Sequence, residues 1–263
     1  MLSSHPQRRQ PVPGGRYLAA IDIGGQDESA TGEFGQLDNP QRDYTVCTIA
    51  RVDTSAEGGS LGPVYQVQDV FVDHGSRHFQ SRPGQPALLD RLLAYLRHWV
   101  VAAVIVDATG VGQGLADALS QSLPPETVIP FNFATSHNKA RLGNDFLALI
   151  ETARFKYFHN QARGSKPAVD AGGDEGGPPG SDAWWFFTQC RACGYELAEG
   201  LPLEKGLKWG VSPTATANLL GRPQLIHDDR LLSAALIAEA DRLYRAGQLL
   251  LGSGVSAVIR REF

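Results

Sequence analysis

The run Val101-Ala-Ala-Val-Ile-Val-Asp107 is almost entirely apolar, which is typical of a parallel strand that helices cover on both faces of its sheet. Directly before it, over residues 89–100, leucines and Trp99 recur at three- and four-residue steps, which predicts an amphipathic helix. Directly after it, Thr109-Gly-Val-Gly112 leads into a second predicted helix, and the apolar residues 128–133 predict another strand. Helices that alternate with strands in this way predict parallel strands joined by right-handed crossovers.

Three β-rich segments precede this region. Tyr17-Leu-Ala-Ala-Ile-Asp22-Ile23 is a short apolar run ended by two glycines, as in a buried strand. Residues 44–52 are rich in β-branched side chains, residues 64–72 alternate partly with polar ones, and a turn signal at 57–60 separates the two. We therefore expect an antiparallel meander whose first strand lies beside the strand ending at Asp107. The predicted fold class is α/β, with a mixed five-stranded sheet (antiparallel meander plus parallel strands) flanked by helices.

The downstream half predicts further helices and one interruption. Residues 139–158 and 184–199 have helical patterns, whereas the Gly-, Pro- and acid-rich segment at about 163–182 indicates a flexible insertion. Lys208-Trp-Gly-Val211 predicts a short strand. A last helix is predicted over 228–245, where alanines on one face would let it approach a sheet closely.

The bulk composition fits one large α/β domain or two small ones, at 263 residues with 42% hydrophobic and 20% charged side chains. Polar residues 1–16 predict a disordered tail or linker, residues 17–250 the folded domain, and residues 251–263 a C-terminal tail. The net charge of −4 argues against a wholly electrostatic nucleic-acid binder, although a local basic groove stays compatible with it.

The three cysteines suggest no disulfide framework. Cys190 and Cys193 form one CxxC pair without a second pair, so half-buried thiols are preferred over a zinc site. No apolar run reaches the roughly 20 residues of a membrane helix, and the first residues lack a signal-peptide core. We therefore expect an intracellular protein with no membrane partner.

Carboxylates stand at the ends of these predicted elements. Asp22 and Asp107 close two apolar strands, and His227-Asp228-Asp229 opens the last helix. Carboxyl ends of parallel strands are where open α/β sheets bind ligands, and a helix N-terminus favours nearby negative charge. Acids that meet in a buried pocket need cations to neutralise them, so the pattern predicts a divalent-metal site, whose most suitable chemistry is on phosphate esters.

Each acid also has a purely structural explanation. Asp22 could be a loop-facing acid, Asp107 could form a strand-end turn, and Asp228 could be a helix N-cap. His227 is more often a satisfied or exposed histidine than a ligand. The functional interpretation therefore depends on all the acids meeting in one place.

These motifs resemble a known family. Asp22-Ile-Gly24 followed by Asp43-Tyr-Thr-Val46, then Asp107-Ala-Thr-Gly-Val-Gly112, then His227-Asp-Asp-Arg-Leu-Leu-Ser-Ala-Ala-Leu236, are similar to the C-terminal nuclease domain of the large terminase subunit of tailed bacteriophages and related viruses. That domain is a member of the RNase H-like superfamily. The resemblance covers roughly residues 17–246, and the ordered set of motifs is more specific than any one of them.

The resemblance implies a metal-dependent endonuclease that cuts double-stranded DNA during packaging, with two Mg²⁺ or Mn²⁺ ions. It implies Asp22, Asp107 and Asp228 as principal, catalytic metal ligands, with Asp229 as a further metal ligand and accessory acid and Asp43 as an accessory acid. It also implies a packaging ATPase domain, a portal and a small terminase subunit as partners, in the cytoplasm of a bacterial host. The chain itself contains no G-x-x-x-x-G-K-[ST] motif, so DNA translocation is not expected of it.

Basic residues in predicted loops or at element ends are weak candidates for a phosphate-binding rim. They are Arg77, Arg82, Lys139, Arg141, Lys205, Lys208 and Arg222. For any one of them an ordinary solvated surface charge is an equally good explanation. Trp184 and Trp185 are interpreted as packing residues rather than base-stacking platforms.

Three alternatives stay open. Another RNase H-like nuclease, such as a Holliday-junction resolvase, would prefer branched DNA. A sugar kinase of the actin-like fold shares a motif similar to Ala20-Ile-Asp22-Ile-Gly24-Gly25, but it needs two similar halves and a second glycine loop. A non-enzymatic DNA-binding module would use the same acids only as structural caps.

Overall fold

The computed structural model describes residues 5–25, 43–55, 62–159, 177–197, 200, 202, 206–251 and 257–259. Its helices are α1 Leu88–Trp99, α2 Gly112–Ser122, α3 Ser136–Glu151, α4 Asp182–Ala192, α6 Asp229–Ala235 and α7 Ile237–Arg245. The strands of its main sheet are β1 Arg16–Asp22, β2 Thr45–Asp53, β3 Val64–Asp73, β4 Ala103–Asp107, β5 Val128–Phe131 and β6 Phe155–Lys156. Three two-stranded pairs are formed by β7 Cys193–Leu197 with β8 Leu207–Val211, β9 Thr216–Leu219 with β10 Arg222–Leu225, and β11 Leu249–Leu251 with β12 Ala257–Ile259.

The main sheet has the predicted mixed topology, in the order β5-β4-β1-β2-β3-β6. Strands β1, β2 and β3 form the antiparallel meander, and β4 and β5 add to β1 in parallel. Within the described residues there is one strand more than the five expected, because the two-residue β6 pairs in parallel with β3 at Tyr65 and Gln66. The predicted fold class is confirmed.

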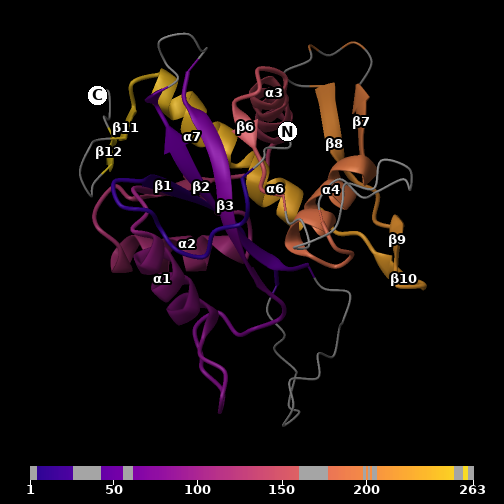
Figure 1. The fold of residues 1–263 in the computed structure, drawn as a ribbon, viewed down its shortest axis with the longest axis horizontal. Helices are drawn as coiled ribbons and strands as arrows, with labels where there is room; N and C mark the ends of the chain where they lie inside the picture. The colour runs from indigo at the N-terminus through magenta and orange to yellow at the C-terminus, as the bar shows by residue number, and fades with distance from the viewer. Residues whose placement is uncertain are drawn as a thin grey trace.

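Helices cover both faces of the sheet, as Figure 1 shows with α1 and α2 below it and α3, α6 and α7 above. The alternation of side chains along β1 explains this arrangement. Ala19 and Ile21 face α1 and α2, where Leu92 is fully buried, whereas Leu18 and Ala20 face the layer that contains α6. Full burial of a leucine stabilises the fold by about 1.5–3 kcal/mol, so the two apolar layers hold the central strands in place.

Two of the predicted helices end earlier than expected. The helix predicted over 139–158 is α3, which ends at Glu151; the left-handed Ala153, with a φ of 56°, then turns the chain into β6. The helix predicted over 184–199 is α4, which ends at Ala192 and passes into β7. In the first case the distant strand β3, and in the second the next strand β8, provides backbone partners that outweigh the local helical pattern. The strand predicted at 208–211 is confirmed as part of β8.

The predicted last helix is divided at Leu236 into α6 and α7. Ser233 fixes α6 on the sheet, because its hydroxyl donates to the Ala20 carbonyl at 2.9 Å and lies 2.8 Å from the hydroxyl oxygen of Thr48. The buried Ala234 leaves room for this close approach, as the alanine pattern predicted. The first turn of α6 is thereby held against the central strands β1 and β2.

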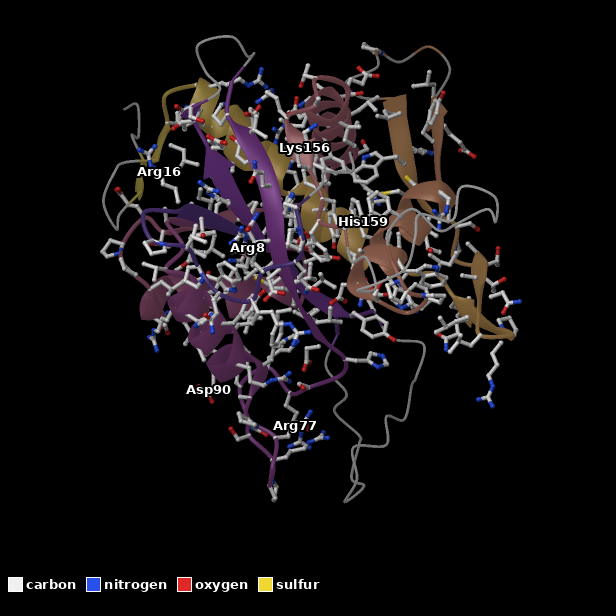
Figure 2. All side chains as sticks on the ribbon, in the orientation of Figure 1. Arg8, Arg16, Arg77, Asp90, Lys156 and His159 are labelled. Carbon is white, nitrogen blue, oxygen red and sulfur yellow. The ribbon has the colours of Figure 1, made fainter. Side chains whose placement is uncertain are left out.

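The expectation of a disordered N-terminal tail is wrong for residues 5–16. The Arg8 N–H donates to the Gln68 carbonyl at 2.9 Å, and the Gln7 amide donates to Asp69 at 2.8 Å. Figure 2 shows Arg8 beside β3. The segment follows β3 because backbone and amide groups can pair there, a kind of contact that composition does not reveal.

The expected domain boundaries also include a C-terminal tail at 251–263 and an insertion at about 163–182. Part of the expected C-terminal tail, Ala257–Ile259, forms β12. Most of the expected insertion, residues 160–176, lies outside the described residues. Among the described helices, none combines the length and apolar character required to span a bilayer.

Candidate metal centre

Two of the predicted acids end neighbouring strands. Asp22 is the last residue of β1 and Asp107 the last residue of β4, and both are buried, at 7% and 9% exposed. In the parallel pairing of these strands Ile21 lies opposite Val106. Asp22 and Asp107 therefore occupy adjacent positions at the carboxyl edge of the sheet, as expected.

The first turn of α6 brings the second pair of acids to this edge. Asp229 is only 3% exposed, and its carboxylate accepts the backbone N–H of Tyr44 at 3.1 Å, at the start of β2. Asp228 occupies the N-cap position, but its side chain makes no capping hydrogen bond. The capping interpretation of Asp228 is therefore not supported, and its carboxylate is available for another role.

The other four predicted acids lie near enough to Asp22 to raise its pKa. The pKa of Asp22 is raised well above its usual range, first by burial and then by repulsion from the other carboxylates, in the order Asp229, Asp107, Asp228 and Asp43. These residues come from β1, β4, α6 and the segment before β2, which are far apart in the sequence. The expectation that the acids meet by folding is correct for this part of the chain.

Two further acids of the cluster are destabilised as carboxylates. Burial raises the pKa of Asp229 to about 7. The Tyr44 N–H opposes this increase, whereas repulsion from Asp43 and Asp228 adds to it. Burial also raises the pKa of Asp107, although Thr109 opposes this, its backbone N–H donating to the carboxylate at 2.8 Å. Each extra negative charge in this pocket therefore costs free energy unless a cation compensates it.

Two glycines let the backbone pass close to these acids. A Cβ on Gly24 would lie 2.4 Å from the Asp43 carbonyl oxygen, and a Cβ on Gly112 would lie 2.4 Å from the Asp107 carbonyl oxygen. Any other residue at either position would push apart segments that carry acids. At Gly110 the space is open, and its φ of 56° serves the turn instead.

Histidines border the cluster on the side of Asp43. The His227 Nδ1 lies 3.1 Å from the Asp43 carboxylate, whose side chain is 72% exposed. The His78 Nε2 lies 3.2 Å from the Gly24 carbonyl, so the loop between β3 and α1 lies against the end of β1. The sequence did not single out His78 or Tyr44, because their contacts depend on backbone groups of distant segments.

The donor set fits a hard divalent cation. Its members are carboxylate oxygens, which Mg²⁺ and Mn²⁺ prefer. Among the described residues, however, no three His, Cys, Asp or Glu side chains are grouped so that they could hold a metal ion as they stand. The fit to a cation therefore depends on the chemistry of the donors and not on a preformed set of ligands.

The predicted basic rim is only partly available. Arg141 is committed to ion pairs with Glu239 at 2.7 Å and Asp145 at 3.6 Å, which makes it a poor candidate for phosphate binding. Lys139 lies over the Trp209 ring, with its Nζ 5.6 Å from the ring centroid. Lys205 lies outside the described residues.

Basic side chains nevertheless lie on two sides of the acids. Arg77 and Arg82 belong to the loop that contacts Gly24, and Figure 2 shows Arg77 at the lower end of the molecule, beyond α1. On the other side, a Cβ on Gly210 would lie 3.1 Å from the Asp228 carboxylate and 3.6 Å from the Lys139 Nζ. Exposed Lys208 lies in the same strand, β8, and Arg222 is exposed on β10.

Comparisons with known proteins agree with this architecture. Residues 71–169 match the family model described as a terminase RNaseH-like domain. No curated protein matches the chain. The chain also resembles solved structures of the large terminase nuclease from thermophilic phage G20c.

In the magnesium-bound structure the TM-score is 0.53 at 16% identity, with 90% of this chain and 92% of that chain covered. In the cobalt-bound structure the TM-score is 0.54 at 16% identity, with the same coverage. A further G20c structure gives a TM-score of 0.52 at 16% identity, covering 89% of this chain and 91% of that one. The fold is therefore RNase H-like, of the terminase nuclease type, and the resemblance indicated by the motifs is confirmed.

Proposed function

We propose, on the premise of this terminase-type fold, that the chain is a Mg²⁺- or Mn²⁺-dependent endonuclease that hydrolyses phosphodiester bonds of double-stranded DNA. Asp22, Asp107 and Asp228 are assigned as principal, catalytic ligands of two metal ions, Asp229 as a further ligand, and Asp43 as an accessory acid. The observation that carries the proposal is that Asp22 and Asp107 are buried at adjacent strand ends, with Asp229 buried beside them at the start of α6. A fold would not retain such a cluster for stability alone.

The chain's own residues orient the acids for this task. The Thr109 N–H holds one oxygen of Asp107, and the Tyr44 N–H holds one oxygen of Asp229, so each carboxylate retains an oxygen for a cation. Asp22 lies among the others and would hold the ions together with them. Two bound ions would supply an activated water and stabilise the leaving oxygen of an in-line displacement.

DNA binding is proposed to use the basic residues on the two sides of the acids. The loop with Arg77 and Arg82 borders one side, whereas Lys139 and Lys208 border the other, so a phosphate backbone that contacts both sides would pass over the acids. Arg222 on β10 is a more peripheral candidate. The packaging ATPase, portal and small terminase subunit are proposed as partners in the host cytoplasm, because large terminases work with them.

The kinase alternative is not favoured by any feature of the fold. An actin-like kinase needs two related halves, whereas the described residues contain one large sheet with smaller two-stranded pairs. The non-enzymatic alternative treats the acids as structural caps, but Asp228 makes no capping hydrogen bond. The nuclease proposal is compatible with one large sheet, and it gives the uncapped Asp228 carboxylate a role as a metal ligand.

Cleavage of supercoiled plasmid in the presence of Mn²⁺ tests the proposal. Wild-type protein is expected to nick and linearise the plasmid, and Asp22→Asn or Asp107→Asn to lose this activity by on the order of a hundredfold or more, because metal stabilisation of the transition state is worth several kcal/mol. Asp117→Asn is the matched control, since Asp117 is an exposed acid on α2. Undiminished cleavage by Asp22→Asn and Asp107→Asn would refute the assigned site.

A further inference from the structure

A cavity of about 530 Å³ lies beside the acid cluster, between α4, the start of α6 and the β9–β10 hairpin. Its lining includes Tyr44, Trp185, Gln189, Gln224, His227 and Arg230. Two of these residues also contact the acids, since the Tyr44 N–H binds Asp229 and His227 lies against Asp43. A ligand in this cavity would therefore lie next to any group bound at the metal centre.

Gln189 presents a hydrogen-bond donor to the cavity. Its side-chain oxygen accepts the Leu231 N–H at 2.9 Å, which fixes the orientation of the amide and makes its NH₂ the group left for a ligand. Gln189 is only 2% exposed, and no hydrogen bond from this NH₂ to another described residue is found. This NH₂, held in a fixed orientation at the cavity wall, is therefore available to a ligand with an acceptor atom.

Trp185 supplies an aromatic surface. It is half-buried and meets Trp184 in an edge contact, with ring centroids 4.8 Å apart and an interplanar angle of 79°. The Tyr44 ring is already engaged, because it stacks on His74 at 4.3 Å and the Arg230 guanidinium lies over it at 5.9 Å. Trp185 is therefore the better platform for a planar ligand.

The charge balance of the cavity favours a base over a phosphate. The Arg230 guanidinium is paired with Asp182, whose carboxylate accepts two of its nitrogens at 2.9 and 3.4 Å. Besides Tyr44, Thr216 and His227, the remaining polar lining consists of the amides of Gln189 and Gln224, which can both donate and accept. Aromatic stacking combined with amide hydrogen bonds is how proteins hold unpaired bases.

We propose that this cavity binds one unpaired nucleobase of the DNA strand adjacent to the scissile phosphate, with the base stacked on Trp185 and an acceptor atom of the base bound by the Gln189 amide. This inference rests on the proposed nuclease function, whose substrate class it narrows. A base within a duplex is stacked on its neighbours and must leave the helix to enter such a cavity. DNA with an unpaired nucleotide, as at a bulge, is therefore the preferred substrate.

Fluorescence of 2-aminopurine tests the proposal by binding rather than by cleavage. The probe is a DNA duplex with a single bulged 2-aminopurine, compared with the same duplex in which 2-aminopurine is paired. The protein carries Asp107→Asn and is studied with Mg²⁺, so that the DNA stays intact. We expect the bulged probe to bind about tenfold more tightly than the paired one and its fluorescence to be quenched by stacking, since one base–aromatic contact is worth about that factor.

Variants of Trp185 test whether the quenching and the preference for the bulged probe depend on this cavity. Trp185→Leu is expected to abolish both the quenching and the preference, whereas Trp185→Phe, which keeps a ring, retains most of each. Tyr195→Leu is the matched control, because Tyr195 is an aromatic residue 75% exposed on β7 and does not line this cavity. Circular dichroism establishes that each variant is folded.

The outcomes separate this inference from the proposed function. Equal affinity for the two probes, or quenching that survives in Trp185→Leu, overturns the cavity assignment, even if wild-type protein cleaves plasmid with Mn²⁺. If the protein prefers the bulged probe but cleaves no plasmid with any divalent metal, base binding in the cavity is supported. The same result contradicts the nuclease function and the placement of the base beside a scissile phosphate. Both preference and cleavage support the whole proposal.

Discussion

Replacing Asp229 by asparagine is expected to stabilise the metal-free protein at pH 8. With a pKa of about 7 in the folded protein, against about 3.9 for an ordinary aspartate, ionising Asp229 costs about 4 kcal/mol more in the folded than in the unfolded chain. Asparagine avoids this cost but accepts the Tyr44 N–H as a neutral group, which forfeits about 1 kcal/mol. The net gain of about 2–3 kcal/mol corresponds to a melting temperature higher by about 5–10 °C.

The direction of the pH dependence follows from the same pKa. A carboxyl whose folded-state pKa is raised binds its proton more tightly in the folded state, so metal-free stability falls as the pH rises from about 4 to about 7. The wild-type protein in EDTA should therefore melt at a lower temperature at pH 8 than at pH 5.5, and Asp229→Asn should reduce this difference. Mn²⁺ should raise the melting temperature of wild-type protein at pH 8, and should do so less for the variant.

Differential scanning calorimetry in EDTA measures these effects, with Asp117→Asn as the control that removes a charge from an exposed position on α2. The control is expected to change the melting temperature by no more than about 2 °C, as surface substitutions usually do. A wild-type protein whose metal-free stability increases from pH 5.5 to pH 8, or an Asp229→Asn protein that melts at a lower temperature than wild type at pH 8, would refute the reasoning.

Two further predictions concern DNA affinity and the core. Lys139→Ala should weaken DNA binding and lower the magnitude of the slope of log K against log salt by about 0.9, because one phosphate contact is lost. Arg97→Ala, a substitution at an exposed position on α1, should leave the slope unaltered. Fluorescence anisotropy over a salt series measures both slopes, and a Lys139→Ala slope equal to that of wild type would exclude Lys139 as a phosphate contact. Asp241→Asn should lower the free energy of unfolding, measured by urea titration, by about 3–5 kcal/mol. The reason is that the substitution removes the counter-charge of the buried Arg154 guanidinium, whose two terminal nitrogens lie 2.5 and 3.0 Å from the Asp241 carboxylate oxygens. A loss below about 1 kcal/mol would contradict this prediction.

The arrangement of the central acids could be predicted from the sequence because each acid ends an element with a strong pattern. The apolar runs before Asp22 and Asp107 define buried strands, and parallel pairing then places their ends together. The small residues of the last helix indicated close packing on the sheet, which Ser233 and Ala234 provide. Chain topology converts these local patterns into one site.

Other features depend on contacts that no local pattern records. Strand β7 forms because β8 lies beside it, although the sequence of β7 continues a helical pattern. The position of Arg141 in the sequence suggested a cation available to phosphate. In the structure Arg141 is paired with Glu239, a residue on another helix, and no local pattern predicts this ion pair. The orientation of the Gln189 amide depends on the Leu231 backbone, and a single sequence gives no signal for such a contact.

The central claim is that five aspartates from distant segments gather to bind divalent cations. Anomalous scattering from a crystal soaked in Mn²⁺ measures this directly, because it locates the metal without reference to activity. We predict manganese peaks bonded to the Asp22 carboxylate and shared with Asp107 and with Asp228 or Asp229. Manganese bound elsewhere on the molecule, with the Asp22 carboxylate free of metal, would contradict it.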